Sequence, residues 1–308
     1  MMTKGLGVMP AAMTFWNADD SYNEKETQKY VKWIIDQGAH SLSVTGSTGD
    51  NISMTIEETK AIMKSMFEAV EGRVPVYPGT GRYNTEQTIE LSQYAQKLGA
   101  AGVLVIMPYY LIPHKRAVMD HFRELRKAID IDIILYDNPT FCNYELLPRE
   151  LVPLVEEGVI NGVKLANGKA ARCHELKHYC GDKVTAFYGH DFEPAEAFLG
   201  GADGWLSGLP AIFPKFSRTL FDICTVEHDP VKAMKYWDGM QDYVDYFITY
   251  NQGNDPHWHE VFKYTLKCFG FDAGLPRRPL RDLQPEEKKT IDKILADMPK
   301  DVIGDFVK

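Results

Sequence analysis

Short apolar segments alternate with amphipathic segments along the first 210 residues of the chain. The apolar segments are rich in Val, Ile, Leu and Tyr and do not alternate regularly with polar residues. This pattern is typical of strands that are buried on both faces of a parallel sheet. We predict eight such strands, over residues 6–13, 41–45, 74–78, 102–108, 131–136, 160–165, 184–188 and 204–207.

The segments between these strands carry the signals of helix ends. Thr55 and Glu58 have the spacing of a capping box and precede a run of apolar residues on one helical face. Asn84 and Gln87 mark the start of the next helix, and Gly99 follows its last turn. Strands and helices are therefore predicted to alternate.

A Gly-Ala step precedes three of the predicted strands, at residues 38–39, 99–100 and 201–202. The step indicates one repeated unit, in which Gly ends a helix and Ala packs beneath the next strand. Eight βα units that repeat in this way predict an α/β fold, a (β/α)8 TIM barrel.

Strand signals stop after about residue 210, and helices are predicted over residues 230–250, 257–269 and 285–296. We therefore expect two parts. Residues 1–225 form the barrel that carries the active site, and residues 226–308 form a C-terminal helical extension packed on it.

Composition and charge restrict the possible partners. The 308 residues are 44% hydrophobic and 25% charged, with a net charge of -9 and no Lys/Arg block, which argues against nucleic-acid binding. The N-terminus has no apolar core of a signal peptide, and no apolar run is long enough to span a bilayer. The five cysteines form no CxxC pair and are odd in number, so we expect free thiols and a cytoplasmic location.

Lys164 lies within an otherwise apolar predicted strand, where an unpaired ammonium is costly. A lysine at the end of a strand can simply extend its amine to solvent. The interpretation that we favour is functional, because burial lowers the pKa of an amine and yields the neutral nucleophile that attacks a ketone.

Other polar groups follow neighbouring strands at the edge where barrel enzymes place their active sites. Residues 45–50, Thr-Gly-Ser-Thr-Gly-Asp, can direct backbone amides and hydroxyls toward a carboxylate or phosphate, although such turns often bond only to themselves. Tyr110 and Tyr136 follow or end two further strands, which indicates phenolic proton transfer.

Together these segments resemble the dihydrodipicolinate synthase / N-acetylneuraminate lyase family of class I aldolases, over essentially the whole chain. The Gly-Ser-Thr-Gly turn, the Tyr-Xaa-Xaa-Pro of residues 136–139 and the Gly-Xaa-Lys of residues 162–164 occur in the family's order and spacing. So do residues 204–208 and the Leu-Pro-Arg of residues 275–277.

The resemblance implies a 2-oxo acid, such as pyruvate, bound as an imine to Lys164, with no metal or other cofactor. Ser47 and Thr48 would hold its carboxylate, and Tyr136 would act as acid and base. Tyr110 would reach into a neighbouring subunit's site and join a relay through Ser47, which requires a homo-oligomer, a dimer or tetramer. Further substrate-binding positions are Gly46, Gly189, Asp191, Ser207 and Phe141.

Three positions depart from the best-known members of this family. Phe141 stands where dihydrodipicolinate synthases carry an arginine for the second substrate's carboxylate. Ala166 and Phe192 replace a hydroxyl residue and a glutamate of sialic-acid lyases. We therefore expect neither activity, but an aldolase, dehydratase or deaminase acting on a small 2-oxo acid. The remaining polar and aromatic positions suit a compact hydroxylated or cyclic 2-oxo or imino acid: Asn138, Asn167, His190, Asp191, Phe141 and Phe192.

The alternatives within the family are dihydrodipicolinate synthase proper and the pyrroline-carboxylate deaminase of the hydroxyproline pathway. Outside it, His174-Glu175-Leu176-Lys177-His178 matches the HExxH pattern of zinc metallopeptidases. We interpret this match as coincidental, because its helix would lie outside the barrel and end at Gly181. His257 and His259 are two residues apart on a helix, which favours a surface or packing role. A non-catalytic binding module would be expected to have lost Lys164 or Tyr136, and both are present.

Overall fold

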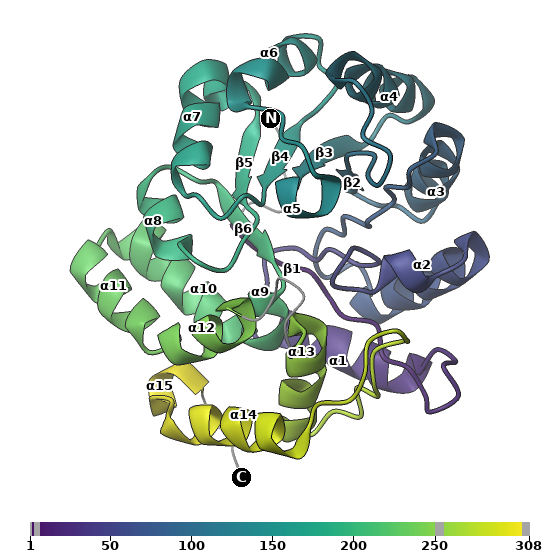
Figure 1. The fold of residues 1–308 in the computed structure, drawn as a ribbon. Coiled ribbons are helices and arrows are strands. Elements are labelled where there is room, and N and C mark those ends of the chain that lie inside the picture. The colour runs from purple at the N-terminus through teal and green to yellow at the C-terminus, as the bar shows by residue number, and fades with distance from the viewer. Residues whose placement is uncertain (1, 3–6, 250–255, 304–308) are drawn as a thin grey trace.

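The computed structural model of the protein describes residues 2, 7–249 and 256–303. Six parallel strands form one sheet in the order β1-β6-β5-β4-β3-β2 (Figure 1). They are β1 Gly7–Pro10, β2 Gly102–Ile106, β3 Asp132–Asp137, β4 Gly162–Leu165, β5 Thr185–Tyr188 and β6 Gly204–Ser207. Each of them coincides with one of the predicted strands, and five are fully buried along their length.

The other two predicted strands, at residues 41–45 and 74–78, are extended segments joined to their neighbours by isolated parallel bridges. The bridges run from Ala11 to Ser43, from Leu42 to Val76 and from Gly79 to Leu104, so they lead from β1 round to β2. A regular strand does not form over residues 74–78 because Pro75 and Pro78 have no N–H to give to a ladder. The prediction of eight strands is therefore confirmed for six, and it is wrong for these two as regular strands.

Helices lie on the outside of the strands (Figure 1). They are α1 Glu24–Asp36, α2 Ile56–Val70, α3 Thr85–Lys97, α4 Lys115–Ala128, α5 Pro139–Cys142, α6 Pro148–Glu156, α7 Ala171–Cys180, α8 Pro194–Leu199, α9 Leu209–Ile212 and α10 Pro214–Asp222. Two short 3-10 helices, Asn51–Ser53 and Gly181–Lys183, and a π-helical segment, Ile223–Glu227, complete this part of the chain.

The predicted helix ends are confirmed. The Glu58 N–H donates to Thr55 Oγ1 at 3.1 Å and the Thr55 N–H donates to Glu58 Oε2 at 2.9 Å, which closes the capping box of α2. The side chain of Asn84 accepts from the Gln87 N–H at 3.1 Å at the start of α3. These side chains satisfy backbone donors that a helix leaves free in its first turn.

The Gly-Ala step recurs as the sequence predicts. Gly38, Gly99 and Gly201 have φ values of +98°, +88° and +94°, which lie in the region that favours glycine. The alanines that follow them, at positions 39, 100 and 202, are buried. The same turn therefore leads from a helix to the next strand or extended segment at three places.

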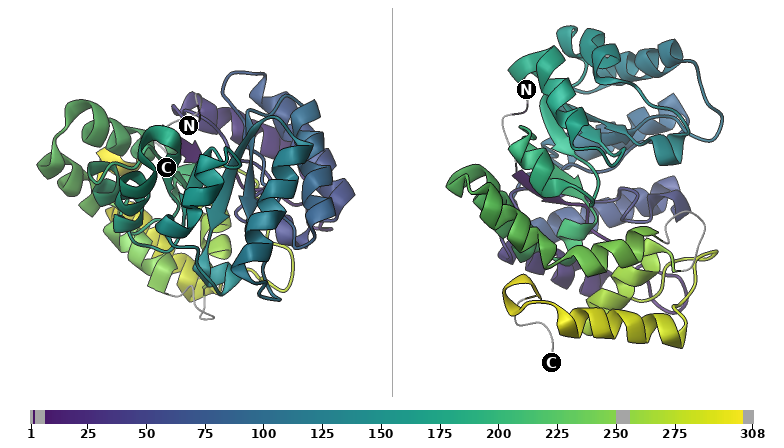
Figure 2. Two further views of the ribbon diagram at one scale, coloured as in Figure 1. Left: turned by 90° about the horizontal axis from the view of Figure 1, so that it is seen from above. Right: turned by 60° about the vertical axis from the view of Figure 1, so that its left-hand side comes forward.

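The C-terminal helices pack together on one side of the molecule, beside α1 and α10 (Figure 2). They are α11 Pro230–Asp238, α12 Gln241–Thr249, α13 Trp258–Cys268, α14 Pro285–Asp297 and α15 Lys300–Ile303. Helix α13 contacts α9, and α15 contacts α10. No helix among the described residues is long and apolar enough to cross a membrane.

The single helix predicted over residues 230–250 is wrong, because the chain turns at Gly239 and Met240 between α11 and α12. A side chain at Gly239 would lie 2.8 Å from Val302 and 3.2 Å from Pro299, so the segment before and within α15 packs directly against this turn. The last residue of that prediction, Tyr250, lies outside the described residues. The other two predicted helices match α13 and α14 within one residue at each end.

A buried lysine joins the C-terminal helices to the segment after β1. The Lys263 amine donates to the carbonyl oxygens of Thr14, at 2.9 Å, and Ala273, at 2.8 Å. All five cysteines are free, as predicted, and only Cys268 is exposed.

Candidate active site

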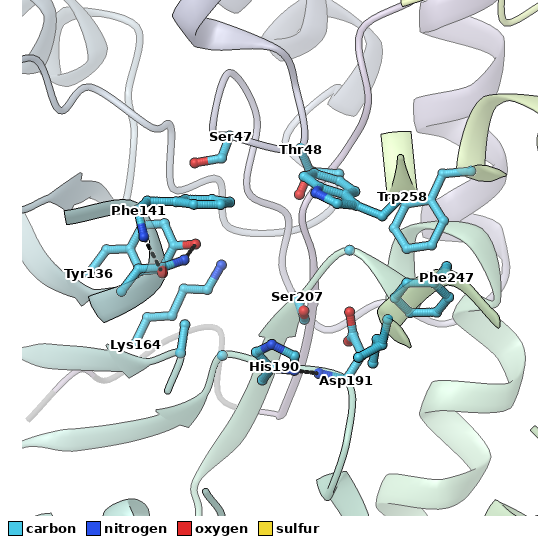
Figure 3. A pocket seen from close by; sticks show the side chains of 16 residues that line it. Ser47, Thr48, Tyr136, Phe141, Lys164, His190, Asp191, Ser207, Phe247 and Trp258 are labelled. Atoms are coloured by element: carbon cyan, nitrogen blue, oxygen red, sulfur yellow. Dashed lines mark hydrogen bonds between the residues drawn. The ribbon is translucent and has the colours of Figure 1, made fainter. Parts of the chain in front are cut away.

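A pocket opens at the carboxyl ends of β3, β4 and β6, and residues of α12 and α13 form part of its wall (Figure 3). Eight of the ten residues predicted for the site line it: Ser47, Thr48, Tyr136, Phe141, Lys164, Gly189, Asp191 and Ser207. Figure 3 shows Ser47 and Thr48 on one side of the pocket and His190 and Asp191 on the other, with the Lys164 side chain between them.

Lys164 comes from β4, and its side chain is only 5% exposed. Its amine lies 4.0 Å from the centre of the Tyr136 ring. Burial lowers the pKa of Lys164 to about 7, although the negative charge of Asp191 acts in the opposite direction. A substantial fraction of this amine is therefore neutral near pH 7, as a nucleophile requires.

Gly189 has no side chain, and the Lys164 side chain occupies the space beside it. A Cβ at this position would lie 2.6 Å from Lys164 Cγ and 3.0 Å from both Lys164 Cε and the Leu165 carbonyl oxygen. The Gly189 N–H donates to that same carbonyl at 2.8 Å, so the backbone is held in place. Gly189 was predicted to line the pocket, and its contacts add a steric reason for glycine.

Tyr136, at the end of β3, is buried, and burial raises the pKa of its phenol. Two hydrogen-bond partners lower that pKa, Asn138 and then Ser47. The Asn138 side-chain amide donates to the phenol oxygen at 2.8 Å. The phenol therefore lies in a dry environment but has polar partners that can stabilise it during proton transfer.

The turn at residues 45–50 is held in a sharply bent form. Thr45 and Asp50 have positive φ values of 51° and 66°. The Thr14 hydroxyl donates to the Gly49 carbonyl at 2.7 Å, and the Trp16 indole N–H donates to Asp50 Oδ2 at 3.0 Å. Among the described residues, no protein group accepts from the backbone N–H groups of Ser47 and Thr48, so both can serve a carboxylate.

A histidine of α13 also supports this turn, and sequence reasoning did not assign it this contact. His259 is buried, and its Nε2 lies 3.2 Å from the Ser47 carbonyl oxygen. Burial, followed by the charges of His257 and Lys263, lowers the pKa of His259 to about 3, so the ring is neutral and its Nε2–H donates to Ser47. A surface or packing role was predicted for His259, and its ring is buried and contacts this turn.

The opposite side of the pocket contains a carboxyl group and a neutral imidazole. Burial raises the pKa of Asp191 to about 6, although a hydrogen bond from Ser207 and the charge of Lys164 both lower it. One carboxyl oxygen, Oδ1, is buried and has no hydrogen-bond partner within the described residues. Burial lowers the pKa of His190 to about 4, and its Nδ1 accepts the Asp191 N–H at 2.9 Å.

Five aromatic or aliphatic side chains also line the pocket: Phe141, Phe247, Ile248, Trp258 and Phe262. Phe192 and Asn167, which the sequence placed in the pocket, do not line it. Phe192 stacks on His190 with ring centres 4.2 Å apart, and the Asn167 amide donates to Glu145 at 2.7 Å. Among the described lining residues, Lys164 is the only one with a lysine or arginine side chain.

Two of the predicted site residues lie outside the pocket of their own chain. Gly46 belongs to the supporting turn, and its backbone packs against Gly79. Tyr110 is 86% exposed, has a φ of +71°, and is followed by the exposed side chains of Leu111 and Ile112. Its position is compatible with a role in another subunit and not in its own pocket.

The HExxH segment lies on α7, away from the pocket. His174 and His178 are exposed, and Glu175 forms an ion pair with Arg172. Among the described residues, no group of three or more His, Cys, Asp or Glu side chains is arranged to hold a metal ion.

Comparison with known proteins identifies relatives along nearly the whole chain. A model of the Dihydrodipicolinate synthetase family matches residues 4–298. The 4-hydroxy-tetrahydrodipicolinate synthase of Clostridium novyi (strain NT) is 29% identical over 300 residues, which cover 96% of this chain and 97% of the relative.

Two solved structures of proteins in complex with pyruvate share this fold. YagE, a prophage protein of the dihydrodipicolinic acid synthase family from E. coli K12, is 26% identical with a TM-score of 0.88, over 94% of this chain and 97% of that one. The chloride-inhibited dihydrodipicolinate synthase from Acinetobacter baumannii is 26% identical with a TM-score of 0.87, over 95% and 98%.

Proposed function

Because the chain belongs to the dihydrodipicolinate synthetase family, whose members are lyases of the class I aldolase type, we propose that it forms an imine between Lys164 and a small 2-oxo acid. The observation that carries this proposal is the buried Lys164 amine, whose lowered pKa of about 7 provides a neutral nucleophile next to the Tyr136 phenol.

The arrangement of the pocket supports a sequence of steps for imine formation. The amides and hydroxyls of Ser47 and Thr48 hold the carboxylate of the 2-oxo acid. The neutral Lys164 amine attacks the ketone carbon, and Tyr136 relays one amine proton to the ketone oxygen, which gives the carbinolamine. Tyr136 then gives its phenol proton to the carbinolamine hydroxyl, which leaves as water, and the protonated imine remains. The protonated imine then withdraws electrons from the neighbouring carbon, so that a proton or carbon group on that carbon can be removed as the electron pair moves into the enamine.

Pyruvate is the first candidate for the 2-oxo acid. The structures of YagE and of the A. baumannii synthase were determined with pyruvate. Ser47, Thr48, Lys164 and Tyr136 all line this pocket, which supports binding of the carboxylate and the ketone of a three-carbon 2-oxo acid. This chemistry requires no metal or organic cofactor.

For the rest of the substrate, we propose an uncharged hydroxylated group. A second carboxylate would lie beside Asp191 and Phe141, and no arginine is among the residues that line this pocket to offset the repulsion. A hydroxyl group can donate to the unpartnered Asp191 Oδ1 and accept a hydrogen bond from His190. Aldol cleavage, dehydration and deamination all remain compatible with such a substrate.

The principal alternative is 4-hydroxy-tetrahydrodipicolinate synthase, the name of the C. novyi relative. A pyrroline-carboxylate deaminase is a second alternative. Product formation from pyruvate and aspartate semialdehyde would support the first, and ammonia release from a pyrroline carboxylate would support the second. Activity with neutral hydroxylated 2-oxo acids, and not with these two substrates, would support the present proposal.

We propose a homo-oligomer, at least a dimer, with a cytoplasmic location and with neither nucleic acid nor a membrane as partner. The exposed apolar side chains of Tyr110, Leu111, Ile112 and Ile52 support an interface between copies of the chain. The free cysteines support a reducing compartment.

We also propose that the sheet and the two extended segments form an eight-membered (β/α)8 barrel over residues 1–225, and that residues 226–308 are an extension of it. The bridges between β1 and β2 support closure of the barrel. Phe247, Trp258 and Phe262 line the pocket, which supports an extension that completes the active site.

The central experiment is trapping with borohydride. The protein is incubated with pyruvate and borohydride, its intact mass is measured, and the modified peptide is identified. We expect one reduced adduct per chain, on Lys164. An unchanged mass with pyruvate and with several other 2-oxo acids would contradict the imine mechanism.

A further inference from the structure

Asn138 contacts the two pocket residues on either side of it through the two ends of one amide. Its Oδ1 accepts the backbone N–H of Phe141 at 3.0 Å, and its Nδ2 donates to the Tyr136 phenol oxygen at 2.8 Å. Asn138 is buried, follows β3 directly and caps the start of α5. One side chain therefore joins the wall of the pocket to the phenol.

The chemistry of the cap fixes which way the amide faces. A backbone N–H can only donate, so the atom of Asn138 that faces Phe141 must be the oxygen. The nitrogen then has to face Tyr136, and an amide nitrogen can only donate. The phenol oxygen accepts at this contact, so its own proton is free to point elsewhere, and the other hydrogen-bond partner of the phenol is Ser47.

The backbone around Asn138 is held firmly enough to maintain this geometry. The Cys142 N–H donates to the Asn138 carbonyl at 2.9 Å, and the Cys142 thiol donates to the Met107 carbonyl at 3.4 Å. Helix α5 is thereby fastened to the segment after β2. The Asn138 amide cannot turn away from Tyr136 without losing its cap.

We infer that Asn138 is a positioning residue for the proton transfer: it directs the Tyr136 proton toward the substrate and stabilises the phenolate left when that proton is given away. This inference rests on the proposed role of Tyr136 as acid and base. A hydrogen bond from a neutral donor strengthens when its acceptor becomes an anion. Burial raises the pKa of Tyr136, and the Asn138 hydrogen bond is the largest of the contributions that lower it.

A purely structural role for Asn138, as the cap of α5, predicts different behaviour. Aspartate caps helices as well as asparagine does, but its carboxylate cannot donate to the phenol and places a negative charge beside it. Asn138→Asp therefore keeps the cap and removes the donor, whereas Asn138→Ala removes both. If the cap alone matters, Asn138→Asp should behave as the unchanged protein does.

The test uses pyruvate alone, so that it does not depend on the unidentified second half of the substrate. Imine formation is measured by rapid borohydride quenching, and proton transfer is measured by NMR as exchange of the pyruvate methyl protons in D2O, both across a range of pH. For Asn138→Asp we expect a retained far-UV circular dichroism spectrum, a loss of about 10-fold or more in both rates near pH 7, and a displacement of the rate profile to higher pH. Asn138→Ala should lose a similar factor in rate with a smaller displacement.

Asn84 provides the matched control, because it caps α3 in the same way and lies outside the pocket. Asn84→Asp and Asn84→Ala should leave both rates and the pH profile unchanged. Asn138→Asp with unchanged rates and pH profile would overturn the inference and leave the imine mechanism intact. If the unsubstituted protein forms no adduct with any 2-oxo acid, the proposed function is overturned. The role of Asn138 is then overturned with it.

Discussion

The Lys164 amine and the centre of the Tyr136 ring are 4.0 Å apart, and the two residues are register partners on the adjacent strands β4 and β3. Paired residues of neighbouring strands direct their side chains to the same face of a sheet. The ring face favours the charged amine by about 2 kcal/mol for a desolvated pair, whereas burial favours the neutral amine. Because the pKa of Lys164 falls to about 7, burial dominates.

The first prediction concerns the pH dependence of imine formation. Burial lowers the pKa of Lys164 to about 7, so its amine is mostly charged below that pH and mostly neutral above it. The initial rate of trapping by pyruvate and cyanoborohydride should rise about tenfold per pH unit below pH 7 and level off above it. A trapping rate that continues to rise toward pH 10 would mean that the pKa of Lys164 is that of an ordinary exposed lysine.

Lys263 is the internal control for this experiment. Burial also lowers its pKa to about 7, but its amine is committed to the carbonyl oxygens of Thr14 and Ala273 and does not line the pocket. Peptide mapping should find the adduct on Lys164 and none on Lys263. Adduct on both lysines would mean that a lowered pKa alone, and not the pocket, determines reactivity.

The second prediction concerns the phenol. Tyr136→Phe keeps the ring beside Lys164 but removes the group that gives and takes a proton, so the exchange of pyruvate methyl protons should slow by about 10²-fold or more. Tyr144→Phe is a suitable control, because it removes a hydroxyl from a partly buried tyrosine outside the pocket. The Tyr144 hydroxyl donates to the Pro108 carbonyl. A nearly unchanged rate for Tyr136→Phe would remove Tyr136 from the mechanism.

The third prediction concerns the space beside the lysine. Gly189→Ala places a methyl group 2.6 Å from Lys164 Cγ, and the hydrogen bond from Gly189 to Leu165 prevents the backbone from moving away. The lysine must therefore shift, and we expect trapping at Lys164 to slow by about 10²-fold while the far-UV circular dichroism spectrum is retained. Trapping at an unchanged rate would show that the lysine side chain has another path into the pocket.

Local features of the sequence predicted most of the fold and much of the pocket. Lys164 and Tyr136 could be found because a charge within an apolar strand and a tyrosine at a strand end are visible over a few residues. The capping box of Thr55 and the glycine at position 99 are equally local. The two prolines at positions 75 and 78 were also visible, and they account for the segment that forms no regular strand.

Contacts between distant segments could not be predicted. His259 reaches the Ser47 carbonyl across 212 positions of sequence, and Lys263 reaches Thr14 across 249. Their partners depend on how α13 docks against the barrel, and the pattern within α13 does not contain that information. The turn at Gly239 likewise depends on Val302, which lies 63 positions later.

The last prediction tests whether Tyr110 acts in a partner's site. Tyr110→Ala should be weakly active, because its own pocket would lack the tyrosine supplied by the neighbour, and Lys164→Ala should be inactive. When the two variants are mixed under conditions that exchange subunits, each mixed dimer contains one complete site, with Lys164 from one chain and Tyr110 from the other. When equal amounts of the two variants are combined, half of the dimers contain one chain of each, and one of the two sites in such a dimer is complete. Activity, measured as exchange of pyruvate protons, should therefore recover to about a quarter of that of the unchanged protein. A Tyr110→Ala, Lys164→Ala double variant, mixed with either single variant, should restore nothing. Activity in the mixture that only equals the average of the separate variants would mean that Tyr110 does not contribute to a neighbouring site.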